Sequence, residues 1–376
     1  MKVAVVIPKY GSVGGAEGFA FELVERLAAR QEIDLHVFSN RCHPGAAPVT
    51  YHHVPILPFP RFMRQISFAW GARRLINHHN VDVIHSHDRI FRMDVCSMHG
   101  IPHRTWITET RKKRMTLFDR AMVWVEKKGL TSPPVPLILP VSHLVKRELL
   151  REYDILESRI QVIHPGVALE RFSRLDQGAC RREVRERHGL SADDVVALFV
   201  GMNFEIKRLS LTIKALGATV GRAQQGDRLK LLVVGQGNET RYRAEATHLG
   251  IGNRVIFAGV RENIEPYYLA GDFFVMPSVF DTFGMAVLEA MAAALPVIIT
   301  EKVGARDLIK DGDEGFVLCA DPSYRELSEK MACLLRQEKR LKMAKHARIV
   351  ALEHGWETVT NRMFGLYRSE KVNHHH

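Results

Sequence analysis

PSVFDTFGMAVLEAMAAALPVII, residues 277–299, is the part of the sequence that most constrains the fold. The apolar run Phe273–Met276 directly precedes this stretch, and a second apolar run, Val297–Thr300, lies at its carboxyl end. Short apolar runs of this kind are typical of buried parallel strands, and the residues between them have the composition of a helix. In an open α/β sheet, ligands bind beyond the carboxyl ends of the strands, at helix N-termini. We therefore expect a binding site on this segment.

Two acids in this segment, Asp281 and Glu289, suit a ligand that is rich in hydroxyl groups, because a carboxylate only accepts hydrogen bonds. Asp281 is expected in the loop after the strand, and Glu289 one to two turns along the helix. Phe283, Gly284 and Met285 are expected near the helix start, where free backbone amides suit a phosphate. A group of hydroxyls joined to a phosphate describes a sugar nucleotide.

The segment resembles the nucleotide-sugar site of the retaining group 1 glycosyltransferases (family 4), which have the GT-B fold. The resemblance implies an α/β protein with two doubly wound, Rossmann-like domains that face an interdomain cleft. It also implies that Glu289 holds the ribose hydroxyls and that Asp281, as a catalytic residue, holds those of the transferred sugar. The family usually has Glu in place of Asp281 and Gly in place of Ala294. The shorter Asp281 leaves the donor sugar open.

Length and composition favour a soluble protein of two domains. The 376 residues exceed one ordinary domain, and 46% hydrophobic with 25% charged residues is typical of globular proteins. No apolar run reaches the length of a membrane span, and the start MKVAVVIP is too short for a secretory signal. Five widely spaced cysteines without a Cys-x-x-Cys pair favour a reduced, cytoplasmic protein. The histidines at 374–376 look like the remnant of a purification tag.

Strands and helices are expected to alternate through both halves of the chain, which predicts two doubly wound sheets. Strands are expected at 3–8, 35–39, 81–86, 137–141, 195–200, 229–234, 255–257, 273–276 and 297–300. Helices are expected near 15–30, 63–79, 143–153, 210–216, 241–249, 285–294 and 324–338. The turn Pro165-Gly166 marks the hinge. We predict an acceptor-binding domain over 1–168 and a nucleotide-sugar domain over 169–351. By resemblance, a closing helix over 352–373 crosses back onto the first domain.

Three loops after strands are further candidates for donor binding. Gly14 and Gly15 join the first strand to a helix; such a turn is common for structural reasons, but it matches the Gly-Gly-x-Glu loop that lies near the donor phosphates in the family. Gly235 opens a Gly-x-Gly turn that lacks the third glycine of a dinucleotide fingerprint. The family has a similar turn near the nucleotide. Arg261 follows a strand whose backbone contacts the base in the family, so it is expected to cover the base.

The segment VGMNFEIKR, residues 200–208, is expected to supply positive charge to a departing diphosphate. Lys207 stands at the head of a helix, where a cation opposes the helix dipole and therefore indicates an anionic ligand; a surface lysine is the alternative. Such a charge would stabilise the transition state, so Lys207 is a candidate catalytic residue. The family commonly grips the diphosphate with an Arg and a Lys. Lys207 aligns with that lysine, and Arg208 is the candidate partner.

Histidines and a pair of aspartates raise the question of a metal. His85 and His87 point the same way if they lie on a strand, which suits a metal, but loop histidines beside a nucleotide site are common. Asp311-Gly312-Asp313 mimics a metal-binding Asp-x-Asp and is better explained as a surface turn. We predict neither a metal nor a cofactor. His99 is either a hydrogen-bonded buried histidine or, by resemblance, a catalytic residue that contacts the transferred sugar near its C6 hydroxyl.

The net charge of +11 favours nucleic acid, an anionic membrane or phosphorylated ligands. Residues 101–130 hold eight basic and three acidic residues, 8 − 3 = +5, interleaved with apolar residues that include Trp106 and Trp124. Such a stretch can lie on an anionic bilayer, or it can be a solvated helix face whose aromatics belong to the core. Concentration of the charge in one segment argues against nucleic-acid binding.

The resemblance implies a metal-independent, retaining hexosyltransferase. We expect it to move glucose from a UDP-sugar to a hydroxyl of a lipid-linked or polysaccharide acceptor, in the cytoplasm or on the inner face of the membrane. The start PKYGSVGG, residues 8–15, and the basic segment are similar to those of bacterial lipopolysaccharide core glucosyltransferases. A sugar-nucleotide epimerase on the same fold is one alternative, and it would turn over without an acceptor. A non-catalytic nucleic-acid-binding protein is the other, suggested by the pI of about 9.5.

Overall fold

The computed structural model describes residues 1–12, 14–222 and 225–373. Val13 of the glycine loop and the histidines interpreted as a tag lie outside these residues. The chain divides into two compact units, the first made of residues 1–166 with the C-terminal segment from Trp356, and the second of residues 167–355. The division expected from the sequence, at 168/169 and 351/352, differs from these junctions by a few residues.

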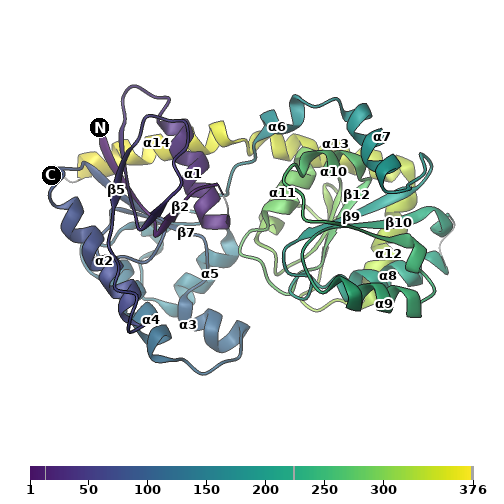
Figure 1. Cartoon of the computed structure of the whole chain (residues 1–376), viewed down its shortest axis with the longest axis horizontal. Helices are drawn as coiled ribbons and strands as arrows, with labels where there is room; N and C mark the ends of the chain where they lie inside the picture. Colours follow the sequence, from purple (N-terminus) through teal and green to yellow (C-terminus); the bar gives the residue numbers. More distant parts are fainter. Residues whose placement is uncertain (13, 223–224, 374–376) are drawn as a thin grey trace. The chain divides into compact units, whose positions relative to one another are not determined.

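Six parallel strands form the sheet of the first unit, in the order β5-β3-β1-β6-β7-β8 (Figure 1). They are β1 (Lys2–Val6), β3 (Asp34–Ser39), β5 (Thr50–His53), β6 (Val83–Ser86), β7 (Val95–Met98) and β8 (Leu137–Pro140). The short strands β2 (Lys9–Tyr10) and β4 (Arg41–Cys42) pair separately. Because the strand order reverses between β1 and β6, their carboxyl ends form the topological switch point, where sheets of this class bind ligands.

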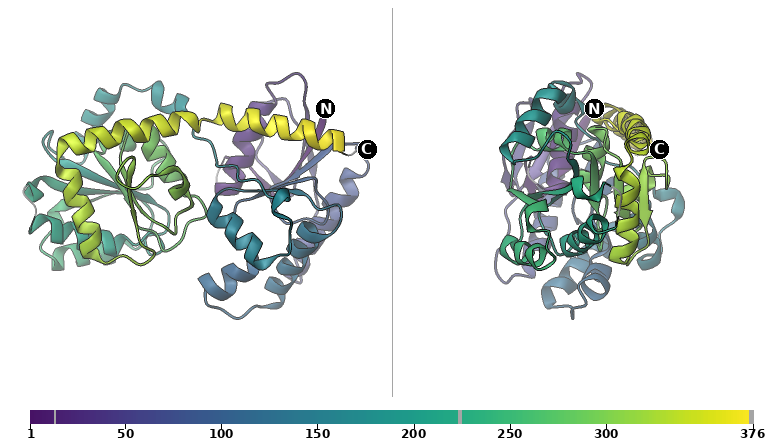
Figure 2. Two further views of the ribbon diagram at one scale, coloured as in Figure 1. Left: turned by 180° about the vertical axis from the view of Figure 1, so that it is seen from behind. Right: turned by 90° about the vertical axis from the view of Figure 1, so that its right-hand side faces the viewer.

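Helices cover both faces of this sheet (Figures 1 and 2). They are α1 (Gly15–Leu27), α2 (Met63–Ile76), α3 (His103–Thr105), the short π-helix η1 (Trp106–Thr110), α4 (Leu117–Thr131), α5 (His143–Glu152), the 3₁₀ turn η2 (Glu157–Arg159) and α14 (Trp356–Asn373). Helix α14, in yellow, packs beside α1, where the rings of Trp356 and Phe19 meet edge to face at 5.1 Å. The hydroxyl of Tyr367, fully buried, lies 2.6 Å from Nδ1 of His85.

The second unit repeats the plan with six parallel strands in the order β11-β10-β9-β12-β13-β14. They are β9 (Val195–Gly201), β10 (Leu229–Gly235), β11 (Val255–Gly259), β12 (Phe273–Met276), β13 (Val297–Thr300) and β14 (Gly315–Leu318). Here the switch point lies between β9 and β12. The prediction of an α/β protein with two doubly wound, Rossmann-like units is confirmed.

The second unit's helices again lie on both faces of the sheet (Figure 1). They are α6 (Leu169–Ser173), α7 (Gln177–Arg187), α8 (Leu209–Val220), α9 (Glu239–His248), α10 (Glu265–Ala270), α11 (Met285–Ala292), α12 (Tyr324–Leu335) and α13 (Gln337–Glu353), with 3₁₀ turns η3 (Gly226–Arg228), η4 (Gly252–Arg254) and η5 (Gly304–Leu308). Within the described chain, no helix is both long and apolar enough to cross a bilayer.

The helix expected at 324–338 is wrong in its extent, because the chain forms two helices there. Arg336 adopts an extended backbone with ψ of 113° and ends α12. The guanidinium of Arg340 then donates to the carbonyl oxygens of Leu334 and Leu335 at 2.7 and 3.1 Å. These bonds satisfy carbonyls that the end of a helix leaves without a partner, so the break is stabilised by a side chain from the next helix.

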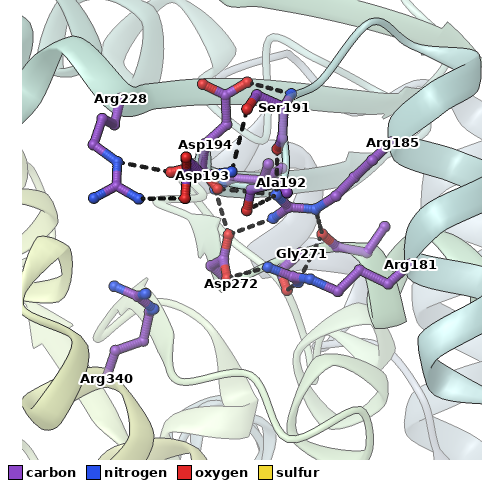
Figure 3. Close-up of polar contacts among 12 residues, drawn as sticks. Arg181, Arg185, Ser191, Ala192, Asp193, Asp194, Arg228, Gly271, Asp272 and Arg340 are labelled. Atoms are coloured by element: carbon purple, nitrogen blue, oxygen red, sulfur yellow. Dashed lines mark hydrogen bonds and ion pairs between the residues drawn. The ribbon is translucent and has the colours of Figure 1, made fainter.

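A buried ionic network fastens α7 to the amino ends of β9 and β12 (Figure 3). The carboxylate of Asp272 accepts from Arg181 at 2.8 Å, from Arg185 at 2.7 Å and from the amide of Val196 at 2.7 Å. Arg185, only 4% exposed, also donates to the carbonyl oxygen of Ser191 at 2.8 Å. The network lies at the end of the sheet opposite the carboxyl ends of its strands, which leaves those ends to other chemistry.

Candidate active site

The switch point of the second unit brings together the two charged residues that the sequence singles out. Lys207 follows β9 and Asp281 follows β12, and the ammonium of Lys207 forms an ion pair with Oδ2 of Asp281. Their side chains are 17% and 20% exposed. The pair forms because β9 and β12 are neighbours in the sheet although 74 residues separate the two side chains.

Glycines at the ends of β9 and β10 set the position of Lys207. A Cβ at Gly201 would lie 2.9 Å from Cγ of Lys207, so the lysine stem lies directly over the strand end. Gly235, at the end of β10, has a φ of +130°, and a Cβ there would collide with the carbonyl oxygen of Gly201. Only glycine fits both demands at Gly235. Gly235 therefore acts on the site through the backbone beneath Lys207.

The loop that carries Asp281 is held by backbone bonds to the loop after β13. The amide of Asp281 donates to the carbonyl of Lys302 at 2.9 Å, and the amide of Gly304 donates to the carbonyl of Asp281 at 2.9 Å. Oδ1 of Asp281 accepts from the amide of Phe283 at 3.3 Å. The backbone of Asp281 is thus held on both sides by the loop after β13, and its carboxylate is oriented by the amide of Phe283.

Helix α11 begins immediately after this loop, with Gly284 as its N-cap and Met285 as its first residue. Gly284 has a φ of +90°, and a Cβ there would lie 2.9 Å from a methyl of Val303, so this sharp entry requires glycine. Among the described residues no side chain caps α11. Its first-turn amides, with the positive end of the helix dipole, can therefore bind an anion.

Glu289 lies in the second turn of α11 and is half-buried. Its Oε2 accepts a hydrogen bond of 2.7 Å from the hydroxyl of Tyr268, a buried residue that the sequence analysis missed. Burial raises the pKa of Glu289, and the nearby charge of Glu265 raises it further. The hydrogen bond from Tyr268 and the charge of Arg171 lower the pKa and offset part of this rise. Hydroxyl groups of a ligand that donate to this desolvated carboxylate would stabilise its ionised form.

The side chains of the two predicted arginines, Arg208 and Arg261, lie apart from the Lys207–Asp281 pair in the second unit. The guanidinium of Arg208 donates to the carbonyl of Ala320 at 3.0 Å and to Asp321 at 2.9 Å, so it is engaged with the loop after β14 rather than with Asp281. Arg261 is exposed after β11, with its guanidinium 5.6 Å from the centre of the Tyr267 ring. Only Lys207 of the predicted cations contacts Asp281 in the described structure.

The switch point of the first unit gathers the remaining predicted residues. Gly14, with a φ of +112°, caps α1, and Gly15 is its first residue. Nε2 of His99 lies 3.0 Å from Nδ1 of His87, and the ring of Phe19 meets that of His99 at 4.9 Å. Burial lowers the pKa of His99 to about 4, so its imidazole is neutral at physiological pH.

The interpretation of His85 and His87 as metal ligands finds no support at His85. Its two ring nitrogens lie 2.6 Å from the hydroxyl of Tyr367 and 2.8 Å from that of Ser97. Burial lowers the pKa of His85 to about 3. Asp311-Gly312-Asp313 is a turn, with Gly312 at a φ of +85° and Asp311 accepting from the amide of Val317.

A cavity of about 280 Å³ opens at this switch point, lined by residues that include His87, Asp88, His99 and Glu126. Glu126 is fully buried and accepts from Arg89 at 2.6 Å and from Tyr153 at 2.5 Å. Burial raises the pKa of Asp88, partly offset by Arg89. The sequence analysis singled out His87 and His99 but did not connect them with Asp88, Arg89 and Glu126. The one signal in the sequence was Asp88-Arg89 directly after the histidines, while Glu126 was counted with the basic segment.

The basic segment divides between core and surface. Met122 and Val123 of α4 are buried, as are Asp119 and Glu126, two of the segment's three acids. Leu117 and Trp124 are 70% and 48% exposed among the lysines and arginines. The segment is therefore a core helix on one side and a basic surface with exposed apolar side chains on the other.

Comparison with known proteins identifies the family. Residues 13–171 match the glycosyltransferase family 4 description, and residues 181–350 match the glycosyl transferases group 1 description. The D-inositol 3-phosphate glycosyltransferase of Streptomyces scabiei is 25% identical over 83% of this chain and 76% of its own. The lipopolysaccharide glucosyltransferase WaaG of Escherichia coli K12 is 24% identical over 93% of each chain.

Solved structures agree on the fold. A crystal structure of WaaG superposes with a TM-score of 0.79 at 21% identity, covering 96% of this chain and 98% of its own. Anabaena HepE, solved with UDP-glucose, gives 0.74 at 18% identity, covering 98% of this chain and all of its own. The two adjoining family matches and the GT-B architecture together show that this chain belongs to the group 1 glycosyltransferases, with a first unit of the family 4 type.

Proposed function

We propose that the protein is a retaining hexosyltransferase that moves glucose from UDP-glucose to a hydroxyl of a membrane-associated glycolipid or polysaccharide. The observation that carries the proposal is the Lys207–Asp281 pair beside the uncapped start of α11, with Glu289 one turn further along. These groups match the parts of a sugar nucleotide: positive charge and amides for its diphosphate, and carboxylates for its hydroxyls.

In this proposal Glu289 binds the ribose and Asp281 the hexose, with Phe283, Gly284 and Met285 at the diphosphate. The ammonium of Lys207 stabilises the negative charge that develops on the departing diphosphate. A metal ion has this role in other enzymes, so in this proposal the transfer needs no metal. Gly235 shapes the strand end, Arg261 covers the base, and Arg208 is the less direct diphosphate partner. The solved complex of HepE with UDP-glucose and the name of WaaG support this donor.

The first unit supplies the acceptor site. We assign the acceptor hydroxyl to the cavity that Asp88 lines, and to His99 the C6 hydroxyl of the hexose, with Gly14 and Gly15 at the donor phosphates. Attack on the face from which the diphosphate leaves would retain the anomeric configuration without a protein nucleophile. With its pKa lowered to about 4, the imidazole of His99 is a weak base, so it suits hydroxyl binding rather than proton removal.

A lipid-linked acceptor on the inner face of the cytoplasmic membrane fits the exposed part of α4. Leu117 and Trp124 stand among basic residues there, as in helices that lie on anionic bilayers. The relatives' names offer two acceptor classes, inositol phosphate and lipopolysaccharide. The exposed apolar residues favour the second, because a soluble acceptor needs no membrane contact.

The test is product formation from UDP-glucose with a truncated lipopolysaccharide core or D-inositol 3-phosphate, followed by NMR of the anomeric proton. We expect an α-linked product with the lipopolysaccharide acceptor and UDP release that depends on it. Turnover of the sugar nucleotide without acceptor would instead indicate an epimerase, and an inverted product would overturn the retaining mechanism.

Lys207→Met tests the central pair. We expect kcat to fall about 10²–10³-fold, because one preorganised charge at the leaving group is lost. Lys310→Met, at an 81% exposed side chain of the same unit, is the matched control and should leave kcat unchanged. Equal kcat in Lys207→Met and the wild type would remove the lysine from the mechanism.

A further inference from the structure

Three histidines from separate elements of the first unit meet on the β5 side of its sheet. His36 lies on β3, His52 on the edge strand β5, and His79 in the turn after α2. One ring nitrogen of each lies within 4.8 Å of the other two. Nδ1 of His36 is 2.8 Å from Nε2 of His52, and the ring of His79 is 4.3 Å from that of His52.

A carboxylate orients this cluster from behind. Nε2 of His36 lies 3.2 Å from Oδ2 of Asp34, so the opposite nitrogen, Nδ1, is the one that faces the other histidines. This is the arrangement in which a carboxylate fixes the tautomer and raises the basicity of a metal-binding imidazole. A histidine that served only to fill the core would not need its second nitrogen directed at two more imidazoles.

Two of the three imidazoles can be reached from solvent, and one is held in place by an aromatic ring. His36 is 7% exposed, while His52 and His79 are half-buried, which leaves them accessible to an ion from solvent. The ring of Phe38 stacks on His52 at 4.4 Å, which fixes the plane of the imidazole.

We propose that His36, His52 and His79 bind a late first-row divalent ion such as Zn²⁺, with Asp34 as the positioning residue and water as the fourth ligand. Neutral imidazoles suit Zn²⁺, Co²⁺, Ni²⁺ and Cu²⁺ rather than Mg²⁺ or Ca²⁺. Metal–nitrogen bonds of about 2.0–2.1 Å place ligand nitrogens roughly 3.3 Å apart, so His36 and His52 need to separate by only about 0.5 Å.

Such an ion would join the edge strand β5 to β3 and to the end of α2. It is separate from the donor groups: all of these except Gly14, Gly15 and His99 lie in the other unit, and none of the three histidines lines the cavity that holds His99. The ion is therefore expected to stabilise the first unit rather than to take part in transfer, and the proposal does not depend on the function assigned above.

The experiment titrates Co²⁺ and Zn²⁺ into the full chain in which the histidines at 374–376 are replaced by serine, so that they cannot contribute ligands. We expect one Co²⁺ per chain with the visible absorption of a tetrahedral site, displaced by Zn²⁺, and a higher unfolding midpoint with Zn²⁺. His52→Asn and His79→Asn should each abolish the Co²⁺ spectrum. Asp34→Asn, which retains all three ligands, should weaken binding about 10–100-fold.

His53→Asn and His78→Asn are the matched controls, because each is an exposed histidine next to a proposed ligand. Both should bind Co²⁺ like the wild type, and circular dichroism without metal verifies that every variant folds. The proposal is overturned if the wild type shows no tetrahedral Co²⁺ spectrum, or if His52→Asn and His79→Asn retain it. A loss of binding in the control variants equal to that in the ligand variants would also overturn it.

Discussion

The ionised side chain of Glu289 is expected to favour donor binding but to lower the stability of the fold, and the effect on stability should depend on pH. Folding raises the pKa of Glu289, so between its unfolded and folded values the folded chain holds more protons, and the ionised carboxylate costs stability at neutral pH. We expect Glu289→Gln to unfold at a higher urea concentration than the wild type at pH 8. The difference should vanish near pH 4, where both states hold the proton. Urea titrations at both values check this.

The same substitution should weaken donor binding, since a neutral amide with one accepting oxygen replaces the carboxylate that accepts from the ribose hydroxyls. Glu329→Gln, at an exposed position of α12, is the control for both measurements. A Glu289→Gln variant that is less stable than the wild type at pH 8 would show that the bond from Tyr268 outweighs the cost of burying the charge.

Gly201 offers a test of how closely Lys207 must be placed. An alanine there would put its Cβ 2.9 Å from Cγ of Lys207, and the nearest contacts are all to that one flexible side chain. We expect Gly201→Ala to weaken binding of UDP-glucose roughly tenfold, or ~1.4 kcal/mol, while unfolding is nearly unchanged. Isothermal titration calorimetry measures the first and thermal melting the second.

Gly217→Ala in α8 is the matched control, because its Cβ would meet only Ile251 at an ordinary 3.6 Å. It should bind the donor normally. Unchanged affinity in Gly201→Ala would mean that the position of Lys207 over the strand end does not matter to the donor.

At the scale of elements, the attachment of α7 depends on one carboxylate. Asp272→Asn leaves Arg181 and Arg185 without their shared charge, and Arg185 is almost fully buried (Figure 3). We expect the variant to lose about 3 kcal/mol of unfolding free energy, as other buried pairs do when one partner is removed. Asp193→Asn breaks only the exposed pair with Arg228 and should change stability by less than about 0.5 kcal/mol. Urea denaturation compares the two.

The sequence predicts most of the strands that are apolar runs, although the short strands β7 and β14 were not predicted. Strands such as β9 and β12 are continuous apolar runs, and α11 follows a loop with Gly284 in a position that only glycine fills easily. Strand β5, with the residues Thr-Tyr-His-His, has no apolar run because it lies at the sheet edge, so it was not predicted. Its histidines belong to the proposed ion site.

Individual residues of the candidate site could be predicted from the loops in which they lie. The contacts between residues on distant elements could not. Asp281 and Lys207 were each identified from their own loop, but their contact follows from strand order. Tyr268 gave no signal, since a tyrosine on a short helix is ordinary until its hydroxyl meets Glu289. Arg208 illustrates the opposite error. It is the neighbour of Lys207 in the sequence, but its guanidinium is bonded to Asp321 rather than directed at Asp281.

At the scale of the whole molecule, the charge of +11 predicts association with anionic vesicles through the exposed part of α4. We expect Leu117→Asp and Trp124→Ala each to lower partitioning onto phosphatidylglycerol vesicles about tenfold, ~1.4 kcal/mol of lost apolar burial. Added salt should weaken binding of all variants. Leu341→Asp, at a 59% exposed leucine of α13, is the control in vesicle sedimentation. Equal partitioning of Leu117→Asp and the wild type would contradict the membrane proposal.

The return of α14 to the first unit has a consequence for how the protein is made. Tyr367 closes over His85, and Trp356 packs on Phe19, yet these partners are encoded at opposite ends of the gene. On the ribosome, residues 167–355 are complete while the earlier unit still lacks a helix. The unit that begins at the N-terminus can therefore be completed only after the other has been translated, and a nascent chain stalled before Trp356 would expose to chaperones the surface that α14 covers.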